Sequence, residues 1–455
     1  MVNEAARIAA LPALVPGRFT GVAFPTCIAA LVEAGPEWLT RAFHATGALP
    51  AERRVVAIER AQEFFGGGMG RKLILDIRYD MPDAGLEERL FCKFPRDFGD
   101  PLRDLFGPLM EPEIRFALLS RRDDFPLTVP ACFFGDYDPE TRSGLLITAR
   151  VPYGEGSIEP AHDKCLDYEV DDPFGHYQAV TKAMAKLAAA HKAGRIGAEI
   201  DRQFPFDASG ADLGSRIPYT ADELAAKLVK LKSFAADHPG LFPDGLGDPA
   251  FLDRFSREAM EVFEMQDAIR RHLNSEPDLI TLCHWNMNLD NAWFWRDEEG
   301  ALQVGLLDWG SVAQMNLAQS FFGMICAAET DFLDAHEDDL IALLLDEYHA
   351  LGGPAVDQAG FMRSLRLAQA LLGVAWMLDA PALIEREVAA IDDVGDRRDP
   401  RLRDVFLARA QHHLLMVLLN EWRREDIGGV LRRFREKAAA CEITAGAAAP
   451  DMSGR

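Results

Sequence analysis

The sequence lacks most of the features that mark a secreted, membrane-bound or nucleic-acid-binding protein. Its seven cysteines are scattered singly, with no CxxC pair and no pair of histidines at metal-ligand spacing. This pattern is typical of reduced thiols in a cytosol, and it argues against a disulfide framework or a zinc site. The formal net charge is −24, which disfavours sequence-independent binding to DNA or RNA.

Long apolar runs are also missing. The first residues, MVNEAARIAALPALVPGRF, contain no basic segment followed by an apolar core, so we expect no signal peptide. The longest apolar stretch, AQALLGVAWMLDAPALI, is interrupted by Asp379 and Pro381, and we expect it to form a buried helix. These absences predict a cytoplasmic protein that has neither a nucleic acid nor a membrane as its partner.

The residues that are present divide the chain into a strand-rich and a helix-rich part. With 455 residues, the chain is too long for one compact core. Before residue 150, apolar residues alternate as they do in strands, for example Leu73, Leu75 and Ile77. After residue 157 they recur at helical spacing, as Val180 and Met184 do.

We therefore predict an α+β protein with two lobes. The N-lobe is a small antiparallel, β-rich sheet with one inserted helix, PEIRFALLS, and the larger C-lobe is α-helical. A hairpin that turns at Glu299-Gly300 interrupts the helices. The predicted segments are an N-terminal helical segment over 1–50, the N-lobe over 51–152, the C-lobe over 153–442 and a disordered tail over 443–455.

A glycine-rich turn lies between the first two long strands. In FFGGGMGRKL the glycines are Gly66, Gly67, Gly68 and Gly70. Because glycine has no Cβ, backbone N–H groups in such a turn can approach a polyphosphate closely. An ordinary hairpin turn has the same composition, so the turn alone leaves both interpretations open.

Lys93 lies on the third predicted strand, in LFCKFP, between apolar neighbours. A lysine in this setting either extends along apolar surface toward water or is held by an acid. Glu113, in the predicted helix, is the acid that we expect at a suitable distance, with Glu111 as the alternative. A strand lysine paired with a helix glutamate can hold the α- and β-phosphates of a nucleotide.

The most informative stretch is CHWNMNLDNAWFW, residues 283–295. It has the spacing HxNxxxxN, and the strand that follows ends in GLLDWG. These motifs resemble the catalytic loop HxDxxxxN and the metal motif DFG of the protein-kinase-like superfamily. They are more similar to its aminoglycoside phosphotransferase and ecdysteroid-kinase-like branch, where the loop reads roughly HGDxHxxN and the metal motif often LLDW. PEWLTRAF, LFCKFP, EIRFALL and MAKLAAAHKAG resemble further segments of that branch, so that the resemblance spans about residues 25–355.

The resemblance implies a two-lobed protein-kinase-like fold that uses ATP and Mg²⁺ to phosphorylate a small molecule. Lys93 would hold the α- and β-phosphates, and Glu113 would orient it. Asn291 and Asp308 would ligate Mg²⁺, which requires hard oxygen donors. The acceptor, an alcohol or an amine, is not readable from the sequence, and neither is the oligomeric state.

The resemblance also assigns positions around the nucleotide. The backbone at Ala149 and Val151, in LLITARV, would form the hinge that contacts adenine. His284 would be a scaffold histidine rather than a base. The aromatic residues after the loop, Trp293 to Trp295, are expected to pack in the hairpin rather than to stack on a ligand.

The loop departs from the family pattern at three positions. Asn286 stands in place of the catalytic aspartate, Asn288 in place of the second loop histidine, and Asn316 in place of an acid that would support the loop backbone. An asparagine cannot accept the proton of the substrate hydroxyl, and positioned general-base catalysis is worth roughly 10²–10⁴-fold. Asp290 is the nearest carboxylate that could replace the missing base.

Three functions therefore remain open from the sequence. The first is an ATP-dependent small-molecule phosphotransferase with an altered catalytic loop, in which Asn286, His284 and Asp308 form the catalytic group. The second is a pseudokinase that binds nucleotide as a sensing or interaction module. The third is another transfer from ATP, such as adenylylation. Phosphoryl transfer depends mostly on positioning and charge stabilisation, so the missing base alone does not exclude activity.

Overall fold

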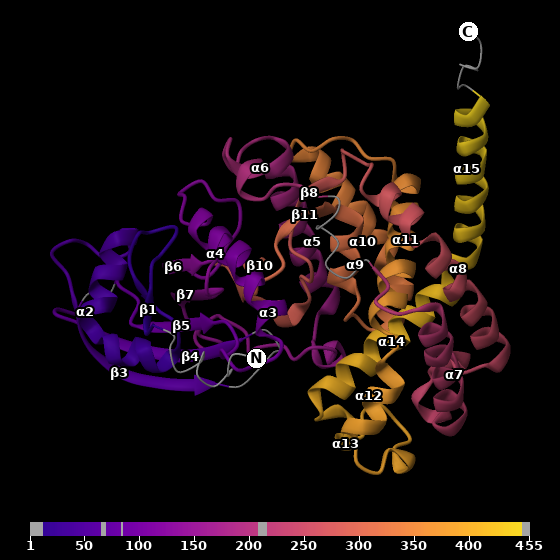
Figure 1. The fold of residues 1–455 in the computed structure, drawn as a ribbon, viewed down its shortest axis with the longest axis horizontal. Coiled ribbons are helices and arrows are strands. Elements are labelled where there is room, and N and C mark those ends of the chain that lie inside the picture. Colours follow the sequence, from indigo (N-terminus) through magenta and orange to yellow (C-terminus); the bar gives the residue numbers. More distant parts are fainter. Residues whose placement is uncertain (1–11, 65–69, 83–84, 208–215, 448–455) are drawn as a thin grey trace, which may run out of the picture. The chain divides into compact units, whose positions relative to one another are not determined.

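The computed structural model describes residues 12–64, 70–82, 85–207 and 216–447 of the chain. These residues form two compact units (Figure 1). The first unit contains Met1–Ala161, Ile196–Phe204 and Asn291–Ala313, and the second contains His162–Arg195, Pro205–Asp290 and Gln314–Arg455. The metal motif thus groups with the sheet, although the sequence boundaries assigned it to the C-lobe.

The first unit is built on a five-stranded antiparallel sheet. The strands have the spatial order β3-β4-β5-β7-β6. Their bounds are β3 Val55–Phe64, β4 Arg71–Tyr79, β5 Arg89–Phe94, β6 Cys132–Asp138 and β7 Ser143–Ala149. Leu73, Leu75 and Ile77 are buried at alternate positions of β4, as the sequence pattern predicts. The antiparallel sheet of the predicted fold is confirmed.

Helices cover both faces of this sheet. α2 (Ile28–Thr46) is bent at Gly35, where φ is 67°, and its Trp38 ring meets Phe134 of β6 edge to face at 5.2 Å. α4 (Met110–Leu119) packs on the other face, because its Ile114 clusters with Leu146 of β7. Leu145 and Ile147, the neighbours of Leu146 on the strand, belong to the cluster on the α2 side. The helix inserted between strands is the one that the sequence predicted.

The hairpin of β9 (Ala292–Arg296) and β10 (Leu302–Leu306) completes the main part of the first unit. It turns at Gly300, where φ is 82°, as the sequence indicated. Trp293 and Phe294 are buried, and a Cβ at Gly305 would lie 2.1 Å from the Trp293 ring, so only glycine fits there. The shorter elements are β1 Leu14–Val15, β2 Phe24–Pro25, α3 Arg103–Phe106 and α6 Ile200–Gln203.

The second unit is predominantly helical. Its helices are α5 Pro173–Lys192, α7 Ala221–Asp237, α8 Pro249–Leu273, α9 Leu317–Ile325, α10 Thr330–Ala350, α11 Gln358–Trp376, α12 Ala380–Glu387, α13 Pro400–Arg403, α14 Phe406–Arg424 and α15 Ile427–Ala447. The strands β8 (Ile280–Cys283) and β11 (Ala313–Asn316) pair with each other. Local signals set several helix starts: Thr220 and Glu223 form a capping box at α7, and Asp172 caps α5.

The apolar stretch expected to be a buried helix lies mostly in α11, whose residues from Leu365 to Ala375 are buried. No single helix in the described part of the chain is long and apolar enough to cross a bilayer. By length and composition alone, one pair passes that test together, α11 with α12, bent by 43°. The first residues of the expected disordered tail belong to α15, which ends at Ala447, and residues 448–455 lie outside the described ranges.

Candidate functional site

The first unit buries a lysine between two carboxylates. Lys93 lies on β5, a central strand of the sheet, and only 5% of its side chain is exposed. Its Nζ donates to Glu113 Oε1 and to Asp308 Oδ1, each at 2.8 Å. Burial disfavours the charged lysine, but the Asp308 and Glu113 carboxylates outweigh burial and raise the pKa of Lys93. The lysine is therefore held as a fixed positive charge.

Glu113, and not Glu111, is the acid that contacts Lys93. Glu113 is buried on α4, whereas Glu111 pairs with Arg18 at 3.0 Å and with Arg115 at 2.5 Å. Burial raises the pKa of Glu113, and the neighbouring ammonium of Lys93 opposes that effect. The helix therefore directs one of its two glutamates to the strand lysine and the other to surface arginines.

Asp308 follows β10 in a left-handed backbone conformation, with φ of 61°, which aspartate tolerates better than most residues. The next residue anchors it: the Trp309 ring stacks on Phe116 of α4 with centroids 3.8 Å apart. Phe116 lies three residues after Glu113, so one helix positions both partners of the lysine cluster. The Asp308 side chain is 40% exposed and can therefore reach a ligand.

Asn291 and Asp308 lie 17 positions apart in the sequence, but the backbone next to Asp308 is hydrogen-bonded to Asn291. The N–H of Leu307 donates to the carbonyl of Asn291 at 3.0 Å. An amide oxygen and a partly exposed carboxylate are hard donors of the kind that Mg²⁺ prefers. The residues present therefore fit a magnesium site that leaves most coordination positions to phosphate and water.

Lys72 is a second cation at this cluster, and the sequence analysis missed it. In the register of β4 and β5 it lies directly opposite Lys93. Burial lowers the pKa of Lys72, as does the charge of Lys93, while Asp308 and Glu113 act in the opposite direction. The alternating pattern placed Lys72 on the face opposite Leu73. Only the strand register, which the pattern does not contain, brings it to Lys93.

The glycine-rich turn is described only in part. Gly66, Gly67 and Gly68 lie outside the described residues. Gly70 begins the strand side of the turn, and a Cβ there would lie 2.1 Å from the carbonyl oxygen of Phe94. Glycine is thus required at Gly70 by the close approach of the strand that carries Lys93.

The predicted hinge residues lie where β7 ends. The N–H of Ala149 donates to the carbonyl of Ala131 at 2.8 Å, and Ala149 pairs with Leu90 of β5. That N–H is therefore engaged within the sheet in this structure. Val151 lies two residues beyond the end of the strand.

The loop after β8 belongs to the second unit as far as Asp290. His284 is buried, and its Nδ1 accepts the N–H of Asn286 at 3.1 Å. Ser320 of α9 donates its hydroxyl to the His284 carbonyl at 2.7 Å. At Gly323 a Cβ would lie 1.7 Å from the Trp285 carbonyl oxygen, so the loop backbone rests directly on α9. The buried imidazole thus contacts the loop backbone two residues further on, and its role as a scaffold residue stays a prediction.

Asn288 connects the loop to α9 and to a lysine that the sequence analysis did not identify. Its Nδ2 donates to the carbonyls of Gly323 and Met324, each at 2.8 Å. Its Oδ1 accepts from Lys164 Nζ at 2.6 Å, and the same ammonium lies 3.3 Å from Asp290 Oδ1. An amide can donate twice and accept once in this way, whereas an ionised carboxylate could not donate.

Lys164 also bears on the alternative base. Burial disfavours its charge, but Asp290 outweighs burial and raises the pKa of Lys164. The Asp290 carboxylate is therefore held by an ion pair on the side of Asn288. The residue that the sequence offered as a replacement for the missing aspartate is thus already engaged by an ammonium group.

The hydrogen bonds of the Asn316 side chain go to groups outside the loop, whereas the sequence led us to expect support of the loop backbone. Its Oδ1 caps α9 by accepting the N–H of Ala318 at 2.9 Å. Its Nδ2 donates to the Leu273 carbonyl and to Glu276, each at 2.9 Å. An N-cap position favours asparagine as much as aspartate, which explains why an amide is stable there. Support for the strand before the loop comes instead from His191 of α5, whose Nδ1 accepts the N–H of Leu282.

No family model and no curated protein matches the chain. A choline/ethanolamine kinase family protein from Mesorhizobium loti is similar in structure, with 15% identity over 87% of this chain and 98% of that chain, at a TM-score of 0.40. A choline kinase from Cryptosporidium parvum is similar with 12% identity over 82% and 91%, at 0.40. The GDP complex of an aminoglycoside 2′-phosphotransferase is similar with 12% identity over 79% and 93%, at 0.37.

At these identities and TM-scores, the assignment of a function depends on the chain's own residues.

Proposed function

We propose that the chain binds ATP with Mg²⁺ and transfers a phosphoryl group to the hydroxyl of a small molecule. The observation that carries this proposal is the cluster of Lys93, Glu113 and Asp308. A buried lysine held by one fully buried carboxylate and one partly exposed carboxylate is suited to receive phosphate oxygens at the exposed side.

In this proposal the first unit supplies the nucleotide contacts. Lys93 holds the α- and β-phosphates, and Glu113 keeps its ammonium in place. Asp308 and Asn291 hold Mg²⁺, which neutralises charge on the phosphates when it is bound. Lys72, opposite Lys93 in the sheet, adds a second positive charge beside the phosphates.

The loop of the second unit contributes less than it does in enzymes with a catalytic aspartate. Asn286 can orient an acceptor hydroxyl through hydrogen bonds, but it cannot take its proton. Losing a positioned base raises the barrier by about 3–5 kcal/mol at most, and positioning and charge stabilisation remain. A slow phosphotransferase is therefore compatible with this loop.

A pseudokinase is the second candidate, and the ion pair of Asp290 with Lys164 favours it. That pair engages Asp290, the one carboxylate among residues 284–291, so the loop offers no carboxylate that is free of an ammonium partner. Nucleotide binding would then serve sensing or interaction rather than transfer. An adenylyl transfer has no observation of its own in the described residues.

The test begins with thermal stabilisation by ATP, and by GTP in a parallel series, with and without Mg²⁺. We expect Mg²⁺-dependent stabilisation of the wild type, and its loss in Lys93→Met and Asp308→Asn. Lys232→Met, which removes an exposed lysine paired with Asp253, is the matched control and should respond like the wild type. The absence of any Mg²⁺-dependent nucleotide stabilisation would refute the phosphotransferase.

The second step separates the two candidates. ADP release that requires an added alcohol, and that increases in Asn286→Asp, identifies a phosphotransferase. Stabilisation by nucleotide without ADP or AMP release, for the wild type and for Asn286→Asp with every alcohol or amine tested, identifies a pseudokinase.

A further inference from the structure

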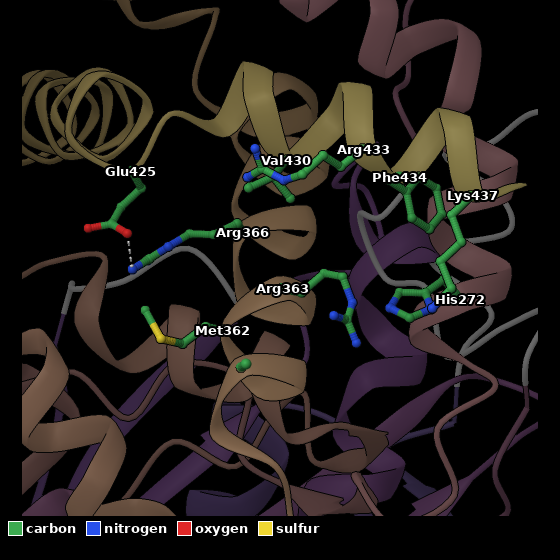
Figure 2. A pocket seen from close by; sticks show the side chains of 10 residues that line it. His272, Met362, Arg363, Arg366, Glu425, Val430, Arg433, Phe434 and Lys437 are labelled. Carbon is green, nitrogen blue, oxygen red and sulfur yellow. Dashed lines mark ion pairs between the residues drawn. The ribbon is translucent and has the colours of Figure 1, made fainter.

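A cavity of about 620 Å³ lies in the second unit, among helices α8, α11 and α15. It shares no residue with the loop after β8 or with the Lys93 cluster. Figure 2 shows the Arg366–Glu425 ion pair at one end, and Phe434, Lys437 and His272 close together at the other. The lining residues are His272, Ala359, Met362, Arg363, Arg366, Glu425, Val430, Arg433, Phe434 and Lys437.

The basic residues of α15 lie on two faces of the helix with different partners. Arg432 lies 3.5 Å from Glu258, and Arg435 lies 3.4 Å from Glu261 and 3.5 Å from Glu264, so the face toward α8 is neutralised by acids. Arg433 and Lys437 point to the cavity together with Phe434, at the i, i+1, i+4 spacing that keeps one broad face. The helix therefore carries one basic face that is held in ion pairs and one basic face, toward the cavity, that forms none in the described ranges.

Three exposed cations at the cavity form no ion pair in the described part of the chain, although Asp426 lies near Arg433 on the α15 side: a Cβ on Gly429 would lie 2.0 Å from Asp426 Oδ2 and 3.1 Å from Arg433 Nη1. Arg363 on α11 and Arg433 and Lys437 on α15 form no ion pair with any residue in the described ranges, although the chain has 72 acidic residues. Arg366 differs, because Glu337, Glu421 and Glu425 hold it. Like charges that face one cavity repel one another, and an anion bound among them would relieve that repulsion.

A neighbouring histidine forms part of the same wall. His272 of α8 lines the cavity, and its ring centroid lies 5.4 Å from that of Phe434. Burial lowers the pKa of His272, and the charges of Arg363 and Lys437 lower it further, against the opposing effect of Glu276. The histidine therefore adds an aromatic wall rather than a fourth cation.

Beside the charged residues and His272, the lining is apolar. Met362, Val430, Phe434 and Ala359 present hydrocarbon and an aromatic ring beside the cations. The volume is that of a site for a small molecule, and a bare inorganic anion would leave most of the wall uncovered. Two guanidinium groups and one ammonium suit an anion with two negative charges, since guanidinium matches phosphate oxygens in pairs.

We propose that this cavity binds a small organic anion that combines a doubly charged head group, such as a phosphomonoester, with an apolar or aromatic body. Arg363, Arg433 and Lys437 bind the head group. Phe434, Met362 and Val430 cover the body. The site is additional to the one proposed for the nucleotide and does not depend on catalysis.

The test uses phenyl phosphate as the probe in calorimetric titrations of the full chain at constant ionic strength. We expect the wild type to bind it, and the triple variant Arg363→Ala/Arg433→Ala/Lys437→Ala to bind at least about tenfold more weakly, because charge-assisted hydrogen bonds are lost. The matched control, Arg432→Ala/Arg435→Ala, removes basic residues from the paired face of the same helix and should bind within about twofold of the wild type.

Two further measurements isolate the groups of the site. Phe434→Ala should weaken phenyl phosphate but leave inorganic phosphate unchanged, and Lys93→Met should leave phenyl phosphate binding unchanged, because that lysine belongs to the nucleotide cluster. The single variant Arg433→Ala, expected to weaken binding several-fold, replaces the triple variant if the latter does not fold.

The proposal is overturned if the wild type does not bind phenyl phosphate, or if the paired-face control loses as much affinity as the triple variant. Equal affinity for inorganic phosphate and phenyl phosphate also overturns it.

Discussion

Two buried ion clusters, one in each unit, differ in how far their charges are closed off from solvent. In the second unit, Arg366 of α11 lies between acids of α10 and α14: its guanidinium donates to both oxygens of Glu337, at 2.7 and 2.8 Å, and to Glu421 at 3.2 Å. The side chains of Glu337 and Glu421 are 0% and 1% exposed. In the first unit, Lys93 is as well buried, but one of its carboxylates, on Asp308, is 40% exposed.

The contrast is between two fully buried carboxylates and one that is partly open to solvent. Glu425, the further partner of Arg366, is 21% exposed and lies at the edge of the cavity described above. Arg366 and Arg424 both form ion pairs with Glu337 and Glu421, so each of these two buried carboxylates is paired with two guanidinium groups. The Lys93 cluster has an open side where an incoming phosphate or metal ion can replace a protein contact. Burial and shifted pKa values occur in both clusters, and exposure of one partner is what distinguishes them.

The largest expected effect comes from opening the closed cluster. Arg366→Met leaves Glu337 and Glu421 buried with only Arg424 to compensate them, and we expect the free energy of unfolding to fall by about 3–5 kcal/mol. Urea unfolding followed by tryptophan fluorescence measures it. Arg363→Met, three residues earlier on the same helix but exposed, is the matched control, and equal losses in both variants would show that the cluster is not structural.

The next effect is a pH dependence of the closed cluster. Burial and the charge of Glu337 raise the pKa of Glu421 to about 7, above the ordinary value of 4.5. The folded chain then holds a proton that the unfolded chain has released, so this group makes stability fall as pH rises from about 4.5 to about 7, by up to about 1.4 kcal/mol per pH unit. Relative to the wild type, Glu421→Gln should remove this slope. Parallel stability curves for the two proteins would contradict the assignment.

Removing the charge of Lys93 should lower stability less than removing Arg366 does, and it should abolish the response to nucleotide. In Lys93→Met, Asp308 remains partly hydrated and Glu113 can take up a proton, so we expect a loss below about 2 kcal/mol in the free energy of unfolding. The double variant Lys93→Met/Glu113→Leu should recover stability, because no buried charge remains, yet show no Mg²⁺-ATP-induced rise in melting temperature. Recovery of the nucleotide response in the double variant would exclude this lysine as the phosphate contact.

The smallest effect is expected at an exposed ion pair. Arg435→Ala removes contacts with Glu261 and Glu264, whose charges are partly hydrated, and should change the free energy of unfolding by less than about 1 kcal/mol. Urea unfolding in low and high salt checks it, since screening should reduce even this difference. A loss comparable to that of Arg366→Met would remove exposure as the criterion that separates the clusters.

Much of the fold could be predicted from local patterns. Alternating apolar residues located β4, and helical spacing located α4 and α5, because burial of one face imposes these periods on the sequence. The candidates Lys93, Glu113, Asn291 and Asp308 were also found from motif order, and the structure brings Lys93, Glu113 and Asp308 into one cluster. Their roles toward a nucleotide remain predictions.

Other contacts could not be predicted, for physical reasons that differ from case to case. Lys72 reaches Lys93 through strand register, which a single strand pattern does not specify. Lys164 reaches Asn288 from an irregular segment far away in the sequence, where no periodicity exists to place it. Asn316 was assigned to the loop by analogy, whereas capping of α9 uses it locally.

By itself the sequence determined the type of the main elements, the presence of an amide at Asn286, and the chemistry available at each motif. These are local properties, set by side-chain type and by the spacing of buried faces. Only the tertiary structure decided which charges meet: Asp308 with Lys93, Asp290 with Lys164, Glu337 with Arg366 and Glu421. Such pairings depend on how strands register and helices pack over long sequence separations, and the energy of each charge depends on the burial that this packing creates.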